Sequence, residues 1–277
     1  MARRMWRGRA VTVACMTTAL AAPGSAVALT THSVTATAPN SAGVLVATAK
    51  CGANEHVVSG GFKSHDFSSA IVSRAVEGNS WTVHLYPESP PLTTYAYCAP
   101  NGQFSLSRHI HKVRVSRQGV NTTASARCAS GERVASGGYV MGPPSATDAN
   151  SPNYKNYATS AGRWTVMSVF AQPPGNLVAF VYCTRGVSVK VRSSSKSIPA
   201  KVMSNPGAGS TTARCHRGET LLSGGYTTTP KPDWMNATGP DFFYNASHRS
   251  GQRAWTARSI NFSAVSGKLT AFAYCAP

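Results

Sequence analysis

The chain has 277 residues and a net charge of +18, although charged residues make up only 13% of it. Thr, Ser, Ala, Val and Gly are abundant, a composition that favours strands and turns over helices. Beyond the N-terminal segment no apolar run approaches the length of a membrane-spanning helix, so we expect no membrane span in the mature protein.

The N-terminus has the pattern of a secretory signal peptide. Four arginines precede an apolar run at residues 10–22, which Pro23 ends, and residues 26–28 read Ala-Val-Ala, an A-x-A cleavage site. We therefore expect cleavage after about Ala28 and a secreted, extracellular mature protein. Removal of residues 1–28 leaves a net charge of +14.

The rest of the chain contains three copies of one unit. Three fifteen-residue segments align without a gap, at residues 48–62, 125–139 and 212–226. Each carries a cysteine at its fourth position and ends in Ser-Gly-Gly followed by an aromatic residue. Each copy then runs to a Trp-Thr pair and closes on Tyr-Cys. The repetition predicts three tandem β repeats, at 29–100, 101–185 and 186–277.

Each repeat predicts five or six short strands in the same order. Alternating segments at 33–37, 112–116 and 187–191 predict the first strands. A strand with the first cysteine follows, and a tight turn leads to a strand that ends in Ser-Gly-Gly. The next strand is expected near residues 70–75, 157–160 and 242–246. Another strand begins at the Trp, and the last strand ends at the second cysteine. The pattern predicts an all-β fold, either as three small disulfide-braced sandwiches or as a pseudo-threefold, β-prism-like arrangement.

Six cysteines lie outside the signal peptide, an even number that indicates a disulfide framework in an exported chain. Fifteen pairings are possible for six cysteines. The repeated pattern begins with one cysteine-bearing strand and ends with another. The simplest disulfide pairing therefore joins the two cysteines within each repeat. It consists of Cys51–Cys98, Cys128–Cys183 and Cys215–Cys275. In the chain-entropy model each bridge contributes about 4 kcal/mol to a small core.

The other recurring residues have structural interpretations that we favour over catalytic ones. Glu55, Glu132 and Glu219 each follow a basic residue by five positions, which predicts an ion pair across a tight hairpin. The Ser-Gly-Gly triplets lack the surroundings of a nucleophile elbow or a P-loop and predict a bulge or close backbone packing. The recurring tryptophans predict core residues rather than exposed stacking platforms; they are Trp81, Trp164 and Trp255.

Two basic stretches open the second and third repeats and are candidates for polyanion binding. Their alternative role is to form a solvated face or a protected sheet edge. The residues are Arg108, Lys112, Arg114 and Arg117 in the first stretch, and Arg185, Lys190, Arg192, Lys196 and Lys201 in the second. His109 and His111 could share a metal ion on one strand face. The neighbouring basic residues would repel a cation, so we expect no metal and no cofactor.

The pattern Cys-x-x-Gly-Glu, Ser-Gly-Gly-Tyr, Trp and Tyr-Cys resembles a module of secreted actinobacterial proteins, most of them uncharacterised. The second repeat carries it at Cys128, Gly131–Glu132, Ser136–Tyr139, Trp164 and Tyr182-Cys183. The resemblance implies export and a β fold and supplies no activity. Threefold repetition with Cys and Gly also resembles the β-prism of vitelline membrane outer layer protein, although the spacings here are longer.

These observations favour a non-enzymatic binding or cell-envelope-associated protein, because structural residues recur and no catalytic set does. Its expected partners are polyanionic or glycan surfaces, such as an anionic cell-wall polymer or polysaccharide. We do not expect specific nucleic-acid recognition. The alternative is a secreted hydrolase with its site in the variable loops, at residues 63–70, 140–156 or 227–241.

Overall fold

The computed structural model describes residues 30–38, 44–64, 69–76, 79–86, 91–103, 105–115, 120–142, 153–169, 175–230 and 242–277. The expected signal peptide lies outside these residues, as does Arg117. The described part of the chain contains eighteen strands and no helix. The described residues therefore include no helix that is long enough and apolar enough to cross a membrane.

Each predicted repeat contains six strands. The first has β1 (His32–Ala38), β2 (Leu45–Lys50), β3 (Glu55–Lys63), β4 (Ser69–Val76), β5 (Ser80–Tyr86) and β6 (Leu92–Pro100). The second has β7 (Ser107–Val115), β8 (Asn121–Arg127), β9 (Arg133–Gly142), β10 (Asn153–Ser160), β11 (Arg163–Val169) and β12 (Gly175–Thr184). The third has β13 (Lys190–Ile198), β14 (Gly207–Arg214), β15 (Thr220–Thr229), β16 (Phe242–Gly251), β17 (Ala254–Asn261) and β18 (Gly267–Ala276).

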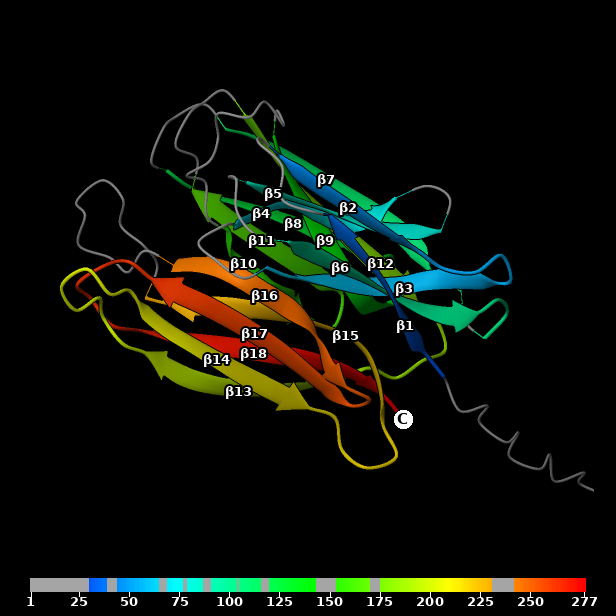
Figure 1. Ribbon diagram of the computed structural model, residues 1–277. Coiled ribbons are helices and arrows are strands. Elements are labelled where there is room, and N and C mark those ends of the chain that lie inside the picture. Colours follow the sequence, from blue (N-terminus) through cyan, green and yellow to red (C-terminus); the bar gives the residue numbers. More distant parts are fainter. Residues whose placement is uncertain are drawn as a thin grey trace, which may run out of the picture.

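The strands form three six-stranded antiparallel sheets, and each sheet is shared by two repeats (Figure 1). The order β1-β6-β3-β16-β17-β14 joins the first repeat to the third. The order β2-β5-β4-β9-β12-β7 joins the first to the second, and β13-β18-β15-β10-β11-β8 joins the second to the third. Because every repeat pairs with both others, the three repeats close on one another with pseudo-threefold symmetry.

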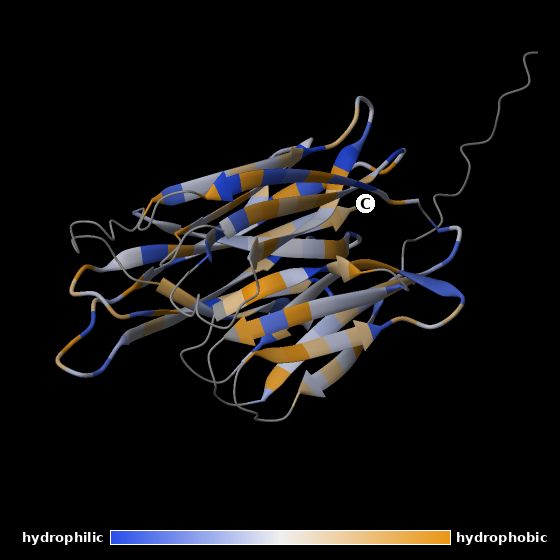
Figure 2. Cartoon of the chain, turned by 90° about the horizontal axis from the view of Figure 1, so that it is seen from above, coloured by the Kyte–Doolittle hydropathy of each residue, from blue (hydrophilic) through white to orange (hydrophobic). Residues whose placement is uncertain are grey.

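Each repeat is also a sandwich, because its six strands are divided between two sheets that pack together. In the first repeat β1, β6 and β3 belong to one sheet, and β2, β5 and β4 to another. Leu45, Ala47 and Ala49 of β2 are buried in this core, while the intervening residues are exposed. Figure 2 shows such alternation of hydrophobic and hydrophilic residues along the strands. The sequence offered sandwiches and a pseudo-threefold arrangement as alternatives, and the fold combines them.

The serine of each Ser-Gly-Gly triplet connects two repeats. Ser136 Oγ donates a hydrogen bond to the carbonyl oxygen of Val58 at 2.6 Å, from the second repeat to the first. Ser59 bonds in the same way to Leu222, and Ser223 to Ala135. All three serines are buried. The bonds run from the first repeat to the third, from the third to the second and from the second to the first, so they form a closed ring.

The two glycines of each triplet allow two different close contacts. A Cβ atom on Gly137 would overlap the indole of Trp164, which belongs to the same repeat. A Cβ atom on Gly138 would overlap the carbonyl oxygen of Ser73, on strand β4 of the first repeat. The other two copies show the same pair of contacts. The glycines therefore allow close packing, as the sequence predicted.

Aromatic residues complete these contacts between repeats. The exposed fractions of Trp81, Trp164 and Trp255 are 1%, 0% and 2%, so the prediction that they are core residues is confirmed. The Tyr hydroxyl before the last cysteine of each repeat accepts a hydrogen bond from a backbone N–H of another repeat. The pairs are Tyr97 with Arg249, Tyr182 with Ala75, and Tyr274 with Ala158.

The three disulfides lie within repeats, as predicted: Cys51–Cys98, Cys128–Cys183 and Cys215–Cys275. In each bridge one cysteine directly follows a strand of one sheet and the other lies on a strand of a second sheet. Each bridge therefore joins the two halves of one sandwich. Three such bridges are typical of a protein in an oxidising, extracellular environment.

Two local predictions were wrong. The first strand of the third repeat was expected at 187–191, but β13 starts at Lys190, where its pairing with Cys275 begins. Val187 and Val189 instead pack against a small apolar cluster that contains Val58. The tight turn before each recurring Glu was expected to close a hairpin. Its two flanking strands, such as β2 and β3, belong to different sheets.

Candidate functional site

The recurring glutamates close the tight turns, and their charges face the first strand of each repeat or the residues beside it. Glu132 accepts hydrogen bonds from the Ala129 N–H at 3.0 Å and Ser107 Oγ at 2.9 Å. Glu132 also contacts His109 Nε2 at 2.9 Å and forms an ion pair with Arg185 at 3.5 Å. The predicted cross-hairpin ion pair with Arg127 was wrong, because the strands on either side of the turn do not pair with each other.

The same arrangement occurs in the other repeats. Glu219 contacts Arg192 at 2.7 Å and Lys190 at 3.8 Å, and Glu55 contacts His32 at 3.4 Å. The hydrogen bond with His109 is the largest cause that lowers the pKa of Glu132 to about 2, ahead of those from Ser107 and the Ala129 N–H. Arg192 is the largest cause of a similar pKa, about 2, for Glu219. The carboxylates of Glu132 and Glu219 are therefore anionic, and their contacts within the protein indicate a structural role.

The predicted basic residues lie mainly on two edge strands, β7 and β13. On β7, the exposed Arg108, Lys112 and Arg114 alternate along one face. On β13 the charge is partly neutralised, because Lys190 and Arg192 contact Glu219. The remaining residues of the second stretch lie apart from that pair. Lys196 is exposed on β13, Lys201 is exposed after it, and Arg185 follows β12 and contacts Glu132.

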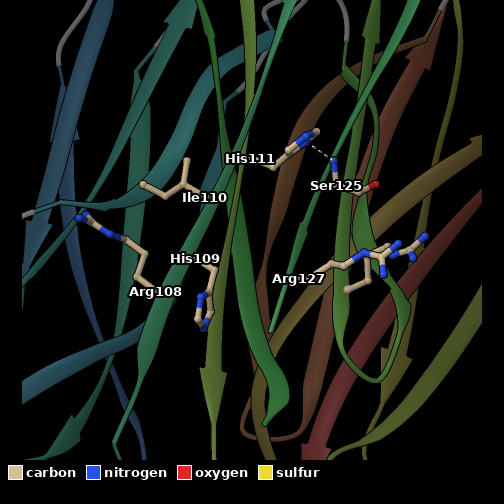
Figure 3. Close-up of a pocket in the computed structure, with 7 residues that line it drawn as sticks. Arg108, His109, Ile110, His111, Ser125 and Arg127 are labelled. Carbon is tan, nitrogen blue, oxygen red and sulfur yellow. Dashed lines mark hydrogen bonds between the residues drawn. The ribbon is translucent and has the colours of Figure 1, made fainter. Parts of the chain in front are cut away.

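A basic groove lies where edge strand β7 crosses edge strand β8 of a different sheet. It has a volume of about 720 Å³ and is lined by Arg108, His109, Ile110, His111, Ser125, Arg127 and Arg163. We call these seven residues the basic groove. Figure 3 shows His111 pointing toward Ser125, while Arg108 and Ile110 project from the other side of β7. The lining contains three arginines, two histidines and no carboxylate.

Two of these arginines are held directly beside each other. Arg127 on β8 and Arg163 on β11 are partners across the antiparallel pair. Like charges in this position destabilise a sheet, and no ion pair relieves them within the described part of the chain. At the equivalent place the first repeat pairs Lys50 with Ser80, and the third pairs Arg214 with an alanine. Only the second repeat therefore doubles the positive charge here.

The two groove histidines already have partners inside the protein. His109 Nε2 lies 2.9 Å from a Glu132 oxygen, and His111 Nδ1 accepts the Ser125 N–H at 3.3 Å. That N–H lies on the edge strand β8, so His111 protects a free sheet edge. Cys183 lies close to His109 and Glu132, but its sulfur is bonded to Cys128 and is not available as a thiolate ligand. The arrangement suits an anion better than a metal ion.

Sequence reasoning identified Arg108 and missed Arg127 and Arg163. Arg127 had been assigned to an ion pair with Glu132, and Arg163 stands alone in the sequence before Trp164. The available signal was the difference between repeats, since the residue before the Trp is Ser80 in the first copy and Ala254 in the third. A basic residue at that position only in the second copy sets that repeat apart.

The loops expected to hold a hydrolase site, at 63–70, 140–156 and 227–241, fall largely outside the described residues. Two further grooves lie within the described residues. One is lined by Tyr157 and Phe272, among others, and the other lies around Arg249. Glu219 is the only carboxylate among the residues that line these two grooves and the basic groove, and it is paired with Arg192.

Comparison with known proteins finds no family model that matches the chain and no curated protein that is significantly similar to it. The proposed function therefore follows from the residues of this chain.

Proposed function

We propose that the protein is a secreted, non-enzymatic binding protein that holds an anionic polymer in the basic groove. Its partner would be an anionic cell-wall polymer or an acidic polysaccharide. The observation that carries this proposal is the cross-strand pair of Arg127 and Arg163, which have no carboxylate partner among the described residues. An anion between the two guanidinium groups would relieve their repulsion and accept charge-assisted hydrogen bonds.

The overall charge supports the same class of ligand. The net charge of +14 that remains without residues 1–28 produces a long-range attraction for polyanions. The buried tryptophans are not available as stacking platforms for bases, which argues for recognition of charge rather than of a nucleotide sequence. Secretion is part of the proposal, and we expect the exported protein to begin close to Leu29 when its N-terminus is sequenced.

A heparin column with a salt gradient tests the proposal. We expect the double variant Arg127→Ser/Arg163→Ser to elute at clearly lower salt than the wild type. The matched control Lys196→Ser/Lys201→Ser removes the same charge from the second basic stretch. The proposal leaves these two exposed lysines outside the binding site, so the control should elute close to the wild type. Equal losses in the two double variants would contradict the assignment to the groove, because only the net charge would then matter. Wall teichoic acid coupled to the same matrix extends the test to a cell-wall polymer.

A further inference from the structure

A second pocket, independent of the basic groove, lies where the second and third repeats meet. It has a volume of about 360 Å³ and includes residues from β9, β10 and β18 and from the start of β13. Its lining includes Arg133, Tyr157, Ala158, Val189, Val191 and Phe272. We call these six residues the junction pocket. Pockets that bind small molecules usually fall between about 300 and 1,000 Å³.

The pseudo-threefold symmetry gives this pocket two counterparts. In all three junctions one backbone N–H of the fourth strand bonds to the Tyr hydroxyl of the neighbouring repeat. The residue that donates this N–H is Ala158 in the junction pocket, Ala75 between the first two repeats, and Arg249 between the third and the first. The junctions can therefore be compared residue by residue.

Arg249 fills the junction between the third and first repeats. Its Nη2 donates to the carbonyl oxygen of Leu221 at 2.7 Å and to Thr31 Oγ1 at 2.8 Å, and its guanidinium lies 4.5 Å from the centroid of the Tyr97 ring. At the junction between the first and second repeats, Arg74 lies 5.3 Å from the Phe180 ring centroid. A cation therefore occupies both of these junctions.

At the positions where the other two junctions carry an arginine, the junction pocket has uncharged residues. Ala158 corresponds to Arg249, and Tyr157, which stacks on Phe272 with ring centroids 4.6 Å apart, corresponds to Arg74. Val191, which is 48% exposed, stands at the edge of the pocket. Its counterpart on β7, at the same register against the last strand, is Arg108. Arg133 is exposed beside this apolar surface and has no carboxylate partner within the described residues.

We propose that the junction pocket binds a small aromatic carboxylate. Its ring would occupy the space that Arg249 fills in the other junction, against Tyr157, Phe272 and the valine side chains. Its carboxylate would bind Arg133, which supplies the charge complementary to the ligand. Aromatic rings favour such surroundings because stacked and edge-on contacts add to apolar burial, and a carboxylate forms strong bonds with a guanidinium group.

Calorimetric titration of the full mature protein with naphthoate tests this site. Binding should be saturable with one site per chain. Ala158→Arg, which introduces the residue that the chain already carries at 249, should abolish it. Arg133→Gln should weaken naphthoate binding by about tenfold or more, the range expected for a lost charge-assisted hydrogen bond. The same variant should leave the affinity for the neutral naphthalenemethanol unchanged. Arg253→Gln, a change at an exposed arginine of the Arg249 junction, is the matched control and should behave as the wild type.

A surface variant keeps the test valid if Ala158→Arg does not fold. Val191→Asp changes an exposed residue and should weaken naphthoate binding by charge repulsion, with an unchanged circular dichroism spectrum. Lack of naphthoate binding by the wild type would overturn the proposal. Equal affinity of the wild type, Arg133→Gln and Val191→Asp would also overturn it, because binding would then lie elsewhere.

Discussion

At Gly138 the lack of a side chain lets strand β9 approach β4 of another repeat. Gly138→Ala would drive a Cβ atom into the backbone carbonyl of Ser73, which cannot move as a flexible side chain could. We expect a loss of about 1–3 kcal/mol in the free energy of unfolding, the usual cost of overpacking. Urea denaturation measures it. Gly162→Ala is the matched control, since its Cβ meets nothing within 4 Å, and it should be neutral or slightly stabilising. Equal stability of the two variants would contradict the packing role of Gly138.

The recurring glutamates make stability depend on pH in the acid range. In the folded protein the pKa values of Glu132 and Glu219 are about 2, against an ordinary value of 4.5. Because the folded values are depressed, their stabilisation is present above about pH 4.5 and is lost as the pH falls toward 2. We expect thermal midpoints to decrease over this window. Glu132→Gln/Glu219→Gln should flatten the decrease, whereas an unchanged slope in the double variant would assign it to other carboxylates.

At the scale of the element, the pairing of β8 with β11 places Arg127 opposite Arg163, and their repulsion lowers the stability of the sheet. We propose that the protein retains this pair because it binds an anion. Arg163→Ser places the residue of the first repeat opposite Arg127 and removes a like-charge pair. We expect stability at low salt to rise by about 0.2–1 kcal/mol, while heparin retention falls. The gain should shrink at high salt because exposed charges are screened. A variant that loses both stability and retention would show that Arg163 supports the fold.

The strands and disulfides could be predicted because the residues that indicate them lie close together in the sequence of each repeat. Alternation around Cys128, the turn before Glu132 and the Tyr-Cys ending recur three times, so each copy supports the others. The pairing of β9 with β4 is different, because only two residue pairs connect them, Val72 with Val140 and Ser73 with Tyr139. The sequence of a strand does not indicate which repeat will pair with its edge. Gly138 predicted a close contact but did not predict which strand makes it.

The candidate site was less predictable, because it depends on how sheets cross. Arg108 belongs to a dense basic stretch and was identified. Arg127 appeared to be paired within a hairpin, an interpretation that failed once β2 and β3, and their counterparts, proved to lie in different sheets. Arg163 is isolated in sequence and becomes part of a basic site only through its position opposite Arg127.

At the scale of the molecule, shared sheets should make unfolding a single event. No repeat can unfold without disrupting two sheets and part of the ring of hydrogen bonds formed by Ser59, Ser136 and Ser223. We expect one calorimetric transition, with calorimetric and van't Hoff enthalpies that agree. Cys128→Ala/Cys183→Ala should lower the stability of the whole by about 4 kcal/mol through loss of a bridge that spans 55 residues. Separate transitions for separate repeats would contradict this coupling.

The central claim is that anion binding belongs to the basic groove, and the salt dependence of affinity tests it most directly. Binding of a defined sulfated oligosaccharide should be measured by titration at several salt concentrations, for the wild type and for Arg127→Ser/Arg163→Ser. Each neutralised sulfate group releases counterions, so replacing both arginines should reduce the slope of log K against log salt by about one for a single anion shared by the pair and by about two for separate anions. Lys196→Ser/Lys201→Ser should keep the wild-type slope. Identical slopes for the wild type and the groove variant would contradict the claim.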